Sequence, residues 1–558
     1  MSDQQGKSDS GFVEIGELIS QRSLTRRDIL KGAAAIGAFG ALGPLAAACG
    51  GSSSGSSASP TAAGGEPKKG GALRVGIGGG SAKDTLDAMT ATSDPQIMTQ
   101  KQIYDGLMGW DENSKLVPLL AESYEASTDA KTWTVKLKSG LQFSNGASVT
   151  ADDVIFSYER ILDPKTAAIG AAGLASLKPG NIKKVDDLTV QFVLDSPSAI
   201  FYEELAYYNN GIVPATGYDP LTAEGAIGTG PWVCTSFQPG QQLDFKANPN
   251  YWGTGPYADT MSFIEFSDPT AKLNALLGGT IDYAVLVDAA QVATVQGTPG
   301  FKILEAKTGG WDPITMRVDK KPFDDERVRQ AMRLIVDRQQ MIDQAYGGFG
   351  WLGNDIYAPY DPGYPKDLPQ RVQDLEQAKS LLKQAGYDNN LTVTLNCSTA
   401  TGAADVQASQ VFAEQAKGAG VTVKVNKVDP SAYWNTGNYG TYTFAWTFWA
   451  TRNYIAQAQR GSVPAQNGAP AAAYWGETWW NDAEWLKLYN EAVKTVDDTA
   501  RNELVTQMAT IDYDRGGYLI HSFHNMNDAY SDKVGGALAD AWGAQSANAS
   551  RFNLLYFV

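Results

Sequence analysis

The chain has 558 residues, of which 43% are hydrophobic and 10% aromatic, so it holds enough apolar material for two or three domains and is not wholly disordered. Its formal net charge is −16 and it has no basic block, which argues against a nucleic-acid partner. The count of only two histidines and three cysteines argues against zinc fingers, iron–sulfur clusters and a dense disulfide scaffold, and we expect no cofactor.

The first 48 residues are predicted to be an export signal. Arg26 and Arg27 precede an uncharged run of small and apolar residues over 32–48, and this pattern resembles a twin-arginine signal. The run is shorter than the ~20 residues that a membrane-spanning helix needs. We therefore expect the protein on the outer face of the bacterial cytoplasmic membrane, or in the periplasm.

The segment around Cys49 resembles the lipobox of bacterial lipoproteins. Small residues precede Cys49 and Gly50 follows it, although Leu45 lies one position further upstream than in the usual pattern. The resemblance implies that Cys49 becomes the first mature residue and carries a lipid that anchors the protein to the membrane. Residues 49–70 are rich in glycine and serine and are predicted to be a flexible tether.

Strands and helices are expected to alternate along the rest of the chain. Apolar residues at every second position predict strands at 73–77, 132–138, 188–194 and 421–425. Thr150, with Asp153 three residues later, predicts the capped start of a helix. One long helix is expected from Asp324 to Ala345, and another follows Asp374. This interleaving predicts a mixed α/β fold.

Several short motifs occur in one order along the chain. They are IYDGL at 103–107, VPLLAESY at 117–124, FSNG at 143–146, TADDVIFS at 150–157, GTGPW at 228–232, NPNYWG at 248–253 and FDDERVRQA at 323–331. Their order and spacing resemble the family 5 extracellular solute-binding proteins, the receptors of peptide/nickel-type ABC importers. The resemblance covers essentially all of residues 71–558.

The resemblance implies a periplasmic-binding-protein type II fold with two hinged lobes and an extra third domain. The implied boundaries are 71–110, 228–308 and 526–558 for domain I, 111–227 for domain II, and 309–525 for domain III. Such a receptor works by hinge closure around its solute, because the ligand shifts the equilibrium from the open state to the closed state. We expect a monomer that delivers a small solute to the permease subunits of an ABC transporter.

An aromatic segment at 442–454 supplies the first candidate ligand-binding residues, Trp446, Trp449 and Arg452. This segment resembles one in peptide-binding relatives, where a Trp is followed shortly by an Asp that holds the ammonium of the peptide. Arg452 matches the position of that Asp. A guanidinium binds a carboxylate or phosphate instead of an ammonium, so Arg452 either holds an anionic group of the ligand or pairs with a local acid.

The other candidate ligand-binding residues are aromatic, apart from one arginine. Trp475 and Trp479 belong to a tryptophan-rich cluster that is able to stack on sugar rings or to pack domain III. Trp311, Tyr433 and Trp434 are weaker candidates, and Arg317 stands where relatives often have Asn.

Three features leave alternatives open. His521 and His524 are three residues apart and lack further Cys or His support, so we expect no metal site. Cys234 and Cys397 are either bonded to each other or separate buried thiols. An exported hydrolase is disfavoured because a serine triad needs a histidine and only these two exist.

The sequence therefore predicts an extracytoplasmic receptor without catalytic activity, most consistent with oligopeptides or peptide-like solutes. An oligosaccharide such as a disaccharide is the main alternative, because of the tryptophan content and the missing Asp. A nickel chelate ranks third, and a surface adhesin that shows no closure is a further class.

Overall fold

The computed structural model describes residues 67–435, 438–463, 476–543 and 545–558. The predicted export signal, Cys49 and the candidate Trp475 lie outside these residues. Within them, no helix combines the length and the apolar character that crossing a membrane requires.

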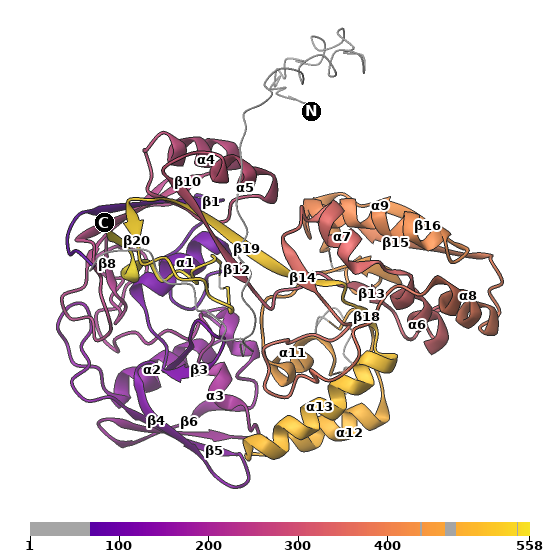
Figure 1. Ribbon diagram of the computed structural model, residues 1–558. Helices are drawn as coiled ribbons and strands as arrows, with labels where there is room; N and C mark the ends of the chain where they lie inside the picture. The colour runs from indigo at the N-terminus through magenta and orange to yellow at the C-terminus, as the bar shows by residue number, and fades with distance from the viewer. Residues whose placement is uncertain (1–66, 436–437, 464–475, 544) are drawn as a thin grey trace, which may run out of the picture. The chain divides into compact units, whose positions relative to one another are not determined.

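An eight-stranded sheet is built from four separate stretches of the chain (Figure 1). Its spatial order is β12 (Phe301–Lys307), β19 (Ser522–Ser531), β11 (Tyr283–Ala284), β1 (Ala72–Gly78), β10 (Thr260–Phe266), β9 (Gln242–Ala247) and β8 (Trp232–Gln238), with β14 (Gly350–Leu352) paired to β19. The central strand β1 is parallel to both of its neighbours and buries Leu73, Val75 and Ile77, as the alternation predicts. The helices of this part are α1 (Asp94–Ile103), α4 (Pro269–Leu277) and α5 (Ala289–Gln296).

A four-stranded antiparallel sheet follows the predicted strand and helix pattern closely. Its strands are β4 (Ala121–Ala126), β5 (Thr132–Leu137), β7 (Thr189–Leu194) and β6 (Leu177–Asp186), and α2 (Ala151–Leu162) packs on it. The Thr150 N–H donates to Asp153 Oδ2 at 2.8 Å, which confirms the predicted helix start. The shorter elements nearby are β2 (Met108–Trp110), β3 (Leu116–Pro118), η1 (Ile169–Ala172) and α3 (Phe201–Glu204).

The third large sheet has five strands and helices on its faces. The strands, in spatial order, are β16 (Val421–Lys427), β15 (Leu391–Cys397), β17 (Phe444–Trp446), β13 (Ile314–Met316) and β18 (Tyr518–Leu519). The neighbouring helices are α6 (Glu326–Ile335), α7 (Arg338–Ala345), α8 (Leu375–Gln384) and α9 (Ala403–Lys417). The remaining elements are α10 (Pro430–Tyr433), α11 (Tyr454–Gly461), α12 (Ala483–Ala492), α13 (Asp498–Arg515), β20 (Val534–Gly535), η3 (Phe552–Leu554) and β21 (Tyr556–Phe557).

The prediction of one long helix from Asp324 to Ala345 is wrong, because two helices, α6 and α7, occupy this stretch. Val336 adopts an extended backbone, and the Asp337 side chain accepts a hydrogen bond from the Gln340 N–H at 2.9 Å. An Asp that caps a new helix competes with continuation of the old one.

The strands β12 and β19 pair antiparallel along the full length of β12 and join the eight-stranded sheet to the part of the chain that carries the five-stranded sheet. The chain leaves through β12, which ends at Lys307, and returns through β19, which begins at Ser522. Two adjacent connecting strands are the kind of link that permits hinge motion.

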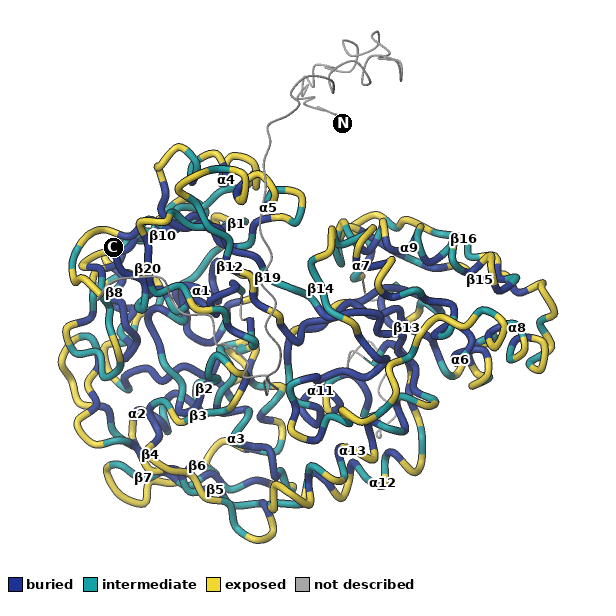
Figure 2. The backbone as a smooth tube through the Cα atoms, in the orientation of Figure 1, coloured by how far each residue is buried: buried dark blue, intermediate teal, exposed yellow. Residues whose placement is uncertain are grey.

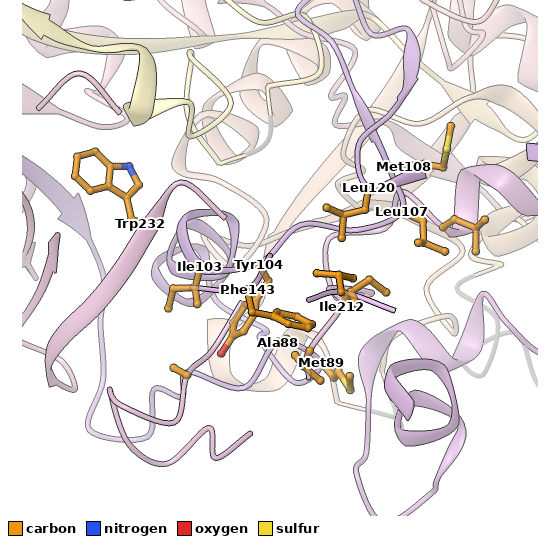
Figure 3. Close-up of a cluster of buried hydrophobic side chains, with 14 of the residues drawn as sticks. Ala88, Met89, Ile103, Tyr104, Leu107, Met108, Leu120, Phe143, Ile212 and Trp232 are labelled. Atoms are coloured by element: carbon orange, nitrogen blue, oxygen red, sulfur yellow. The ribbon is translucent and has the colours of Figure 1, made fainter. Parts of the chain in front are cut away.

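The buried hydrophobic residues form clusters that follow the sheets described above. One cluster joins the eight-stranded and four-stranded sheets, and Figure 3 shows part of it around Tyr104 and Phe143. A second cluster lies around the five-stranded sheet, whose strands β13 and β17 are buried throughout (Figure 2). Cys234 and Cys397 are both free and buried, so the sequence alternative of separate thiols is the correct one.

Candidate functional site

A cavity of about 490 Å³ is lined by segments that are far apart in the sequence. The lining includes residues from the α1 region, from 203–208, from 448–456 and from 540–553. Volumes of about 300–1,000 Å³ are typical of small-molecule sites. The cavity therefore has the size of a solute-binding pocket.

The segment after β17 presents Trp449 and Arg452 to this cavity. The backbones of Trp449 and Trp311 exchange two hydrogen bonds of 2.9 and 3.0 Å, which fix the segment against the start of the five-stranded sheet. Beyond Arg452 the chain enters α11, whose Tyr454 N–H donates to Asp361 Oδ2 at 2.7 Å. The side chain of Arg452 thus projects from a segment that is held at both ends.

Arg452 forms no ion pair with any carboxylate of the described residues. Its Nη1 lies 3.4 Å from Gln457 Oε1, and its guanidinium carbon lies 5.7 Å from the centroid of the Trp449 ring. Burial, followed by the nearby positive charge of Arg460, lowers the pKa of Arg452 to about 10. Of the two sequence alternatives for Arg452, the geometry therefore disfavours the local acid.

Arg460 does have a carboxylate partner. Its Nη2 lies 3.1 Å from Glu204 Oε2. The side chain of Arg460 is 22% exposed to solvent and that of Glu204 is 5% exposed. This ion pair connects α11 to α3 beside the cavity. Glu204 is thereby used by Arg460 and is not the partner of Arg452.

Glu203, the neighbour of Glu204, lines the cavity and has no cationic partner among the described residues. Its Oε1 accepts a hydrogen bond from Asn453 Nδ2 at 3.0 Å, whereas its buried Oε2 has no hydrogen-bond partner. Burial raises the pKa of Glu203 to about 8, and the charges of Asp361 and Glu204 act in the same direction.

Other titratable groups of the cavity are held by protein partners. Asp105 Oδ2 accepts from Trp252 Nε1 at 2.8 Å, and burial raises the pKa of Asp105 to about 6. His524 Nε2 lies 2.9 Å from Asp312 Oδ2. Burial alone would lower the pKa of His524, but Asp312 raises it overall. Asp105 and His524 are therefore already engaged by other side chains of the protein.

His521, the other histidine, does not share the cavity with His524. It is fully buried, and burial lowers its pKa to about 3, with smaller effects of His524 and Arg338. The described residues contain no group of three or more His, Cys, Asp or Glu side chains that is arranged to hold a metal ion.

Two predicted ligand residues lie in the core around the five-stranded sheet. Trp446 is 1% exposed and donates from Nε1 to Ser409 Oγ at 2.7 Å. Tyr433 is fully buried and donates from its hydroxyl to the Trp446 carbonyl at 2.6 Å. By contrast, Phe448 follows β17, is 53% exposed and lines the cavity.

The predicted residues Arg317 and Trp479 contact each other outside the cavity lining. Arg317 Nη2 lies 2.6 Å from Asp319 Oδ2, and its guanidinium carbon lies 4.3 Å from the Trp479 ring centroid. Arg317 therefore has the local acid partner that Arg452 lacks.

Trp311 and Trp434 support the cavity from behind its lining. Trp311 is buried and stacks on Tyr357 with ring centroids 5.5 Å apart, and its ring also faces Trp449. Trp434 packs edge-on against Phe448 at 5.6 Å. Both residues contact aromatic side chains that reach the cavity.

Sequence reasoning missed the contribution of α3 and of the chain end to the cavity. Glu203, Tyr207 and Tyr208 line it from one side, and Trp542 and Arg551 line it from another. A pair of acids followed within four residues by a pair of tyrosines was a visible pattern at 203–208. Its meaning depends on Arg452 and Asn453, which lie about 250 positions away in the sequence.

The chain resembles known binding proteins over most of its length. A family model for bacterial extracellular solute-binding proteins, family 5, matches residues 115–462. The dipeptide-binding protein of Escherichia coli (strain K12) is 28% identical over 469 residues, which cover 77% of this chain and 85% of that protein. Protein XP55 of Streptomyces lividans is 31% identical over 326 residues, 57% of this chain and 58% of that protein.

Solved structures share the fold. The PBP AgaA from A. tumefaciens R10, in complex with agropinic acid, matches with a TM-score of 0.69 and 25% identity over 88% of this chain and 99% of that one. The substrate-binding protein CtaP of Listeria monocytogenes matches with a TM-score of 0.75 and 23% identity, over 88% and 100%. The fold is thus the type II periplasmic-binding-protein fold that the sequence predicts. With more than half of its length matched by the family model, the chain belongs to the bacterial extracellular solute-binding proteins of family 5.

Proposed function

We propose that this solute-binding protein is the extracytoplasmic receptor of an ABC importer for short peptides or peptide-like solutes, and that Arg452 binds a carboxylate of the solute. The observation that carries the proposal is a guanidinium that lines the cavity with no acid partner among the described residues. An Arg forms strong, bidentate hydrogen bonds with a carboxylate. The dipeptide-binding relative in E. coli and the complex of AgaA with agropinic acid support this choice of ligand class.

Aromatic side chains supply the remaining surface of the proposed site. Tyr207, Tyr208, Phe448 and Trp449 all line the cavity. They offer apolar area for side chains of the solute, and Trp449 Nε1, which has no hydrogen-bond partner among the described residues, is an available donor. The same rings would also stack on a sugar, which keeps an oligosaccharide as the competing ligand.

A thermal-shift screen separates these ligands, because a solute that binds only the folded protein raises its melting temperature. The panel contains the Ala-Xaa dipeptides, trialanine, maltose, lactose and a nickel–histidine chelate. We expect peptides to raise the melting temperature of the full chain. Replacing the terminal carboxylate of the best peptide by an amide, or Arg452 by Met, should remove most of the shift. A response to sugars alone would overturn the peptide assignment.

The domain boundaries and the hinge are part of the same proposal. Domain I would comprise 71–110, 228–308 and 526–558, with 111–227 inserted as domain II and 309–525 as domain III. The antiparallel strands β12 and β19 support a hinge at the passage between domains I and III. Small-angle scattering with and without the best peptide tests this part, since closure reduces the radius of gyration.

Membrane attachment through a lipid on Cys49, delivery to a permease, a monomeric state and the absence of catalysis complete the proposed role. The lipobox-like sequence supports the anchor, and the binding-protein relatives support delivery to a permease and a binding role without catalysis. The monomeric state is carried over as an expectation from the sequence. Cys49→Ser should move the protein from the membrane fraction to the soluble fraction. Recovery of the bound peptide in intact form, by mass spectrometry after long incubation, tests for the absence of hydrolysis.

A further inference from the structure

A basic and an acidic side chain of the cavity, Arg452 and Glu203, are each left without an ion-pair partner among the described residues. Both line the same cavity. They are not each other's partner, because no ion pair joins them, and their neighbours Arg460 and Glu204 pair instead.

We propose that Glu203 is the anchor for an amine of the bound solute, so that the cavity holds the two charged ends of a dipolar solute at Glu203 and Arg452. This inference rests on the proposed function and adds the second anchor and its polarity. The amine would be held from the α3 side of the cavity, while the position that resembles the amine-binding Asp of peptide-binding relatives carries Arg452.

The surroundings of Glu203 fit an acceptor for a cation. Oε1 is fixed by Asn453 Nδ2, which leaves the buried Oε2 as the free acceptor. A buried acceptor without a partner costs free energy, and an ammonium that donates to it would remove that cost. The orientation of the carboxylate is thus set before the solute arrives.

Several charged groups surround Glu203, and Arg460 of α11 is one of them. Asp361 and Glu204 are acidic neighbours that raise its pKa, whereas Arg501 lowers it. Arg501 is itself engaged, because its Nη2 donates to the Tyr202 hydroxyl at 2.9 Å and it pairs with Asp498. Glu204 is paired with Arg460. The net surroundings favour the neutral acid in the empty cavity and reward an incoming positive charge.

The test compares two forms of one peptide on two forms of the protein. The probes are the dipeptide of the Ala-Xaa panel that binds most tightly and its N-acetyl derivative, and the proteins are the full chain and Glu203→Gln. Calorimetric titration should show that acetylation and Glu203→Gln each weaken binding by roughly tenfold or more, the loss of about one charged hydrogen bond. In Glu203→Gln, acetylation should change the affinity by less than about threefold. The carboxylate of Glu203 and the peptide amine bind each other, so the second loss adds little once the first has occurred.

The control is Glu503→Gln, an exposed acid on α13 that does not line the cavity, and it should behave like the unmodified protein. Gln has nearly the shape of the protonated acid, so melting temperatures of the empty variants should agree and confirm folding. If peptides bind but Glu203→Gln retains the full effect of acetylation, the amine lies elsewhere and the inference fails while the proposed function stands. If no peptide of the panel binds, the proposed function itself fails.

Discussion

Arg460 and Glu204 form a partly buried ion pair, with 3.1 Å between Nη2 and Oε2, that connects α11 to α3 beside the cavity. The pair engages one arginine and one glutamate, and it leaves Arg452 and Glu203 available to a ligand. This division of four charged residues into a structural pair and two ligand-facing groups is the basis of the predictions below.

The ion pair is expected to stabilise the fold. Glu204→Gln leaves the partly buried Arg460 without a compensating charge and should lower the free energy of unfolding by roughly 1–3 kcal/mol, measured by urea denaturation. Glu122→Gln is the matched control, because Glu122 pairs with Lys136 at 2.7 Å with about half of each side chain exposed. An exposed pair contributes roughly 0–1 kcal/mol. Equal effects of the two substitutions would contradict the structural role of Glu204.

Arg452→Met should not destabilise the empty protein. Burial opposes the charge of Arg452, as its lowered pKa of about 10 indicates, and no described acid compensates it. Removing a partly buried cation that has no acid partner is expected to leave the melting temperature unchanged or to raise it. Differential scanning calorimetry provides the measurement. A fall of several degrees would mean that Arg452 stabilises the fold through a contact outside this account.

Binding of a peptide with a free amine is expected to depend on pH through Glu203. Since burial raises the pKa of Glu203 to about 8, its carboxyl is neutral below that pH and must lose a proton when an ammonium binds. The affinity should therefore rise between pH 6 and 8, by up to about tenfold per unit. Above pH 8 it should fall again, because the peptide amine itself loses its proton at about 7.7–8.0.

Calorimetric titrations at several pH values check this profile. Glu203→Gln should remove the rise between pH 6 and 8 while it leaves the decline at higher pH. A rise that persists in Glu203→Gln would assign the titration to another group of the cavity, such as His524 or Asp105.

Trp446→Phe should affect stability and not ligand affinity. The substitution leaves Ser409 Oγ without the indole donor that lies 2.7 Å away in a buried site. The expected cost is roughly 1–3 kcal/mol, from the lost hydrogen bond and the imperfect filling of the core. Urea denaturation measures the cost, and titration with the best peptide should give an affinity within about twofold of the unmodified protein.

Local patterns in the sequence were sufficient for much of the fold. Thr150 and Asp153 determine the start of α2 through contacts three residues apart, and alternation at Leu73, Val75 and Ile77 identifies β1. The break between α6 and α7 was missed because Asp337 lies inside a run with helical spacing, and only its capping bond with Gln340 ends the pattern.

The candidate site was less predictable, because it depends on contacts between distant segments. Arg317 and Arg452 are both candidate ligand-binding arginines in the sequence. Arg317 pairs with Asp319, whereas no described acid pairs with Arg452. The part played by Glu203 follows from Asn453, which lies 250 positions further along the chain. The acid partner of Arg317 is only two residues away, whereas the surroundings of Arg452 and Glu203 come from distant segments that local spacing does not reveal.

The central claim is that the cavity selects a solute with a carboxylate and an amine. Native mass spectrometry is the test of this selectivity. The full chain is mixed with the peptides, with their N-acetyl and amide forms, and with the two disaccharides. We predict that one peptide with both ends free is retained per chain, in preference to either blocked form. Preferential retention of a disaccharide, or equal retention of free and doubly blocked peptides, would contradict the account.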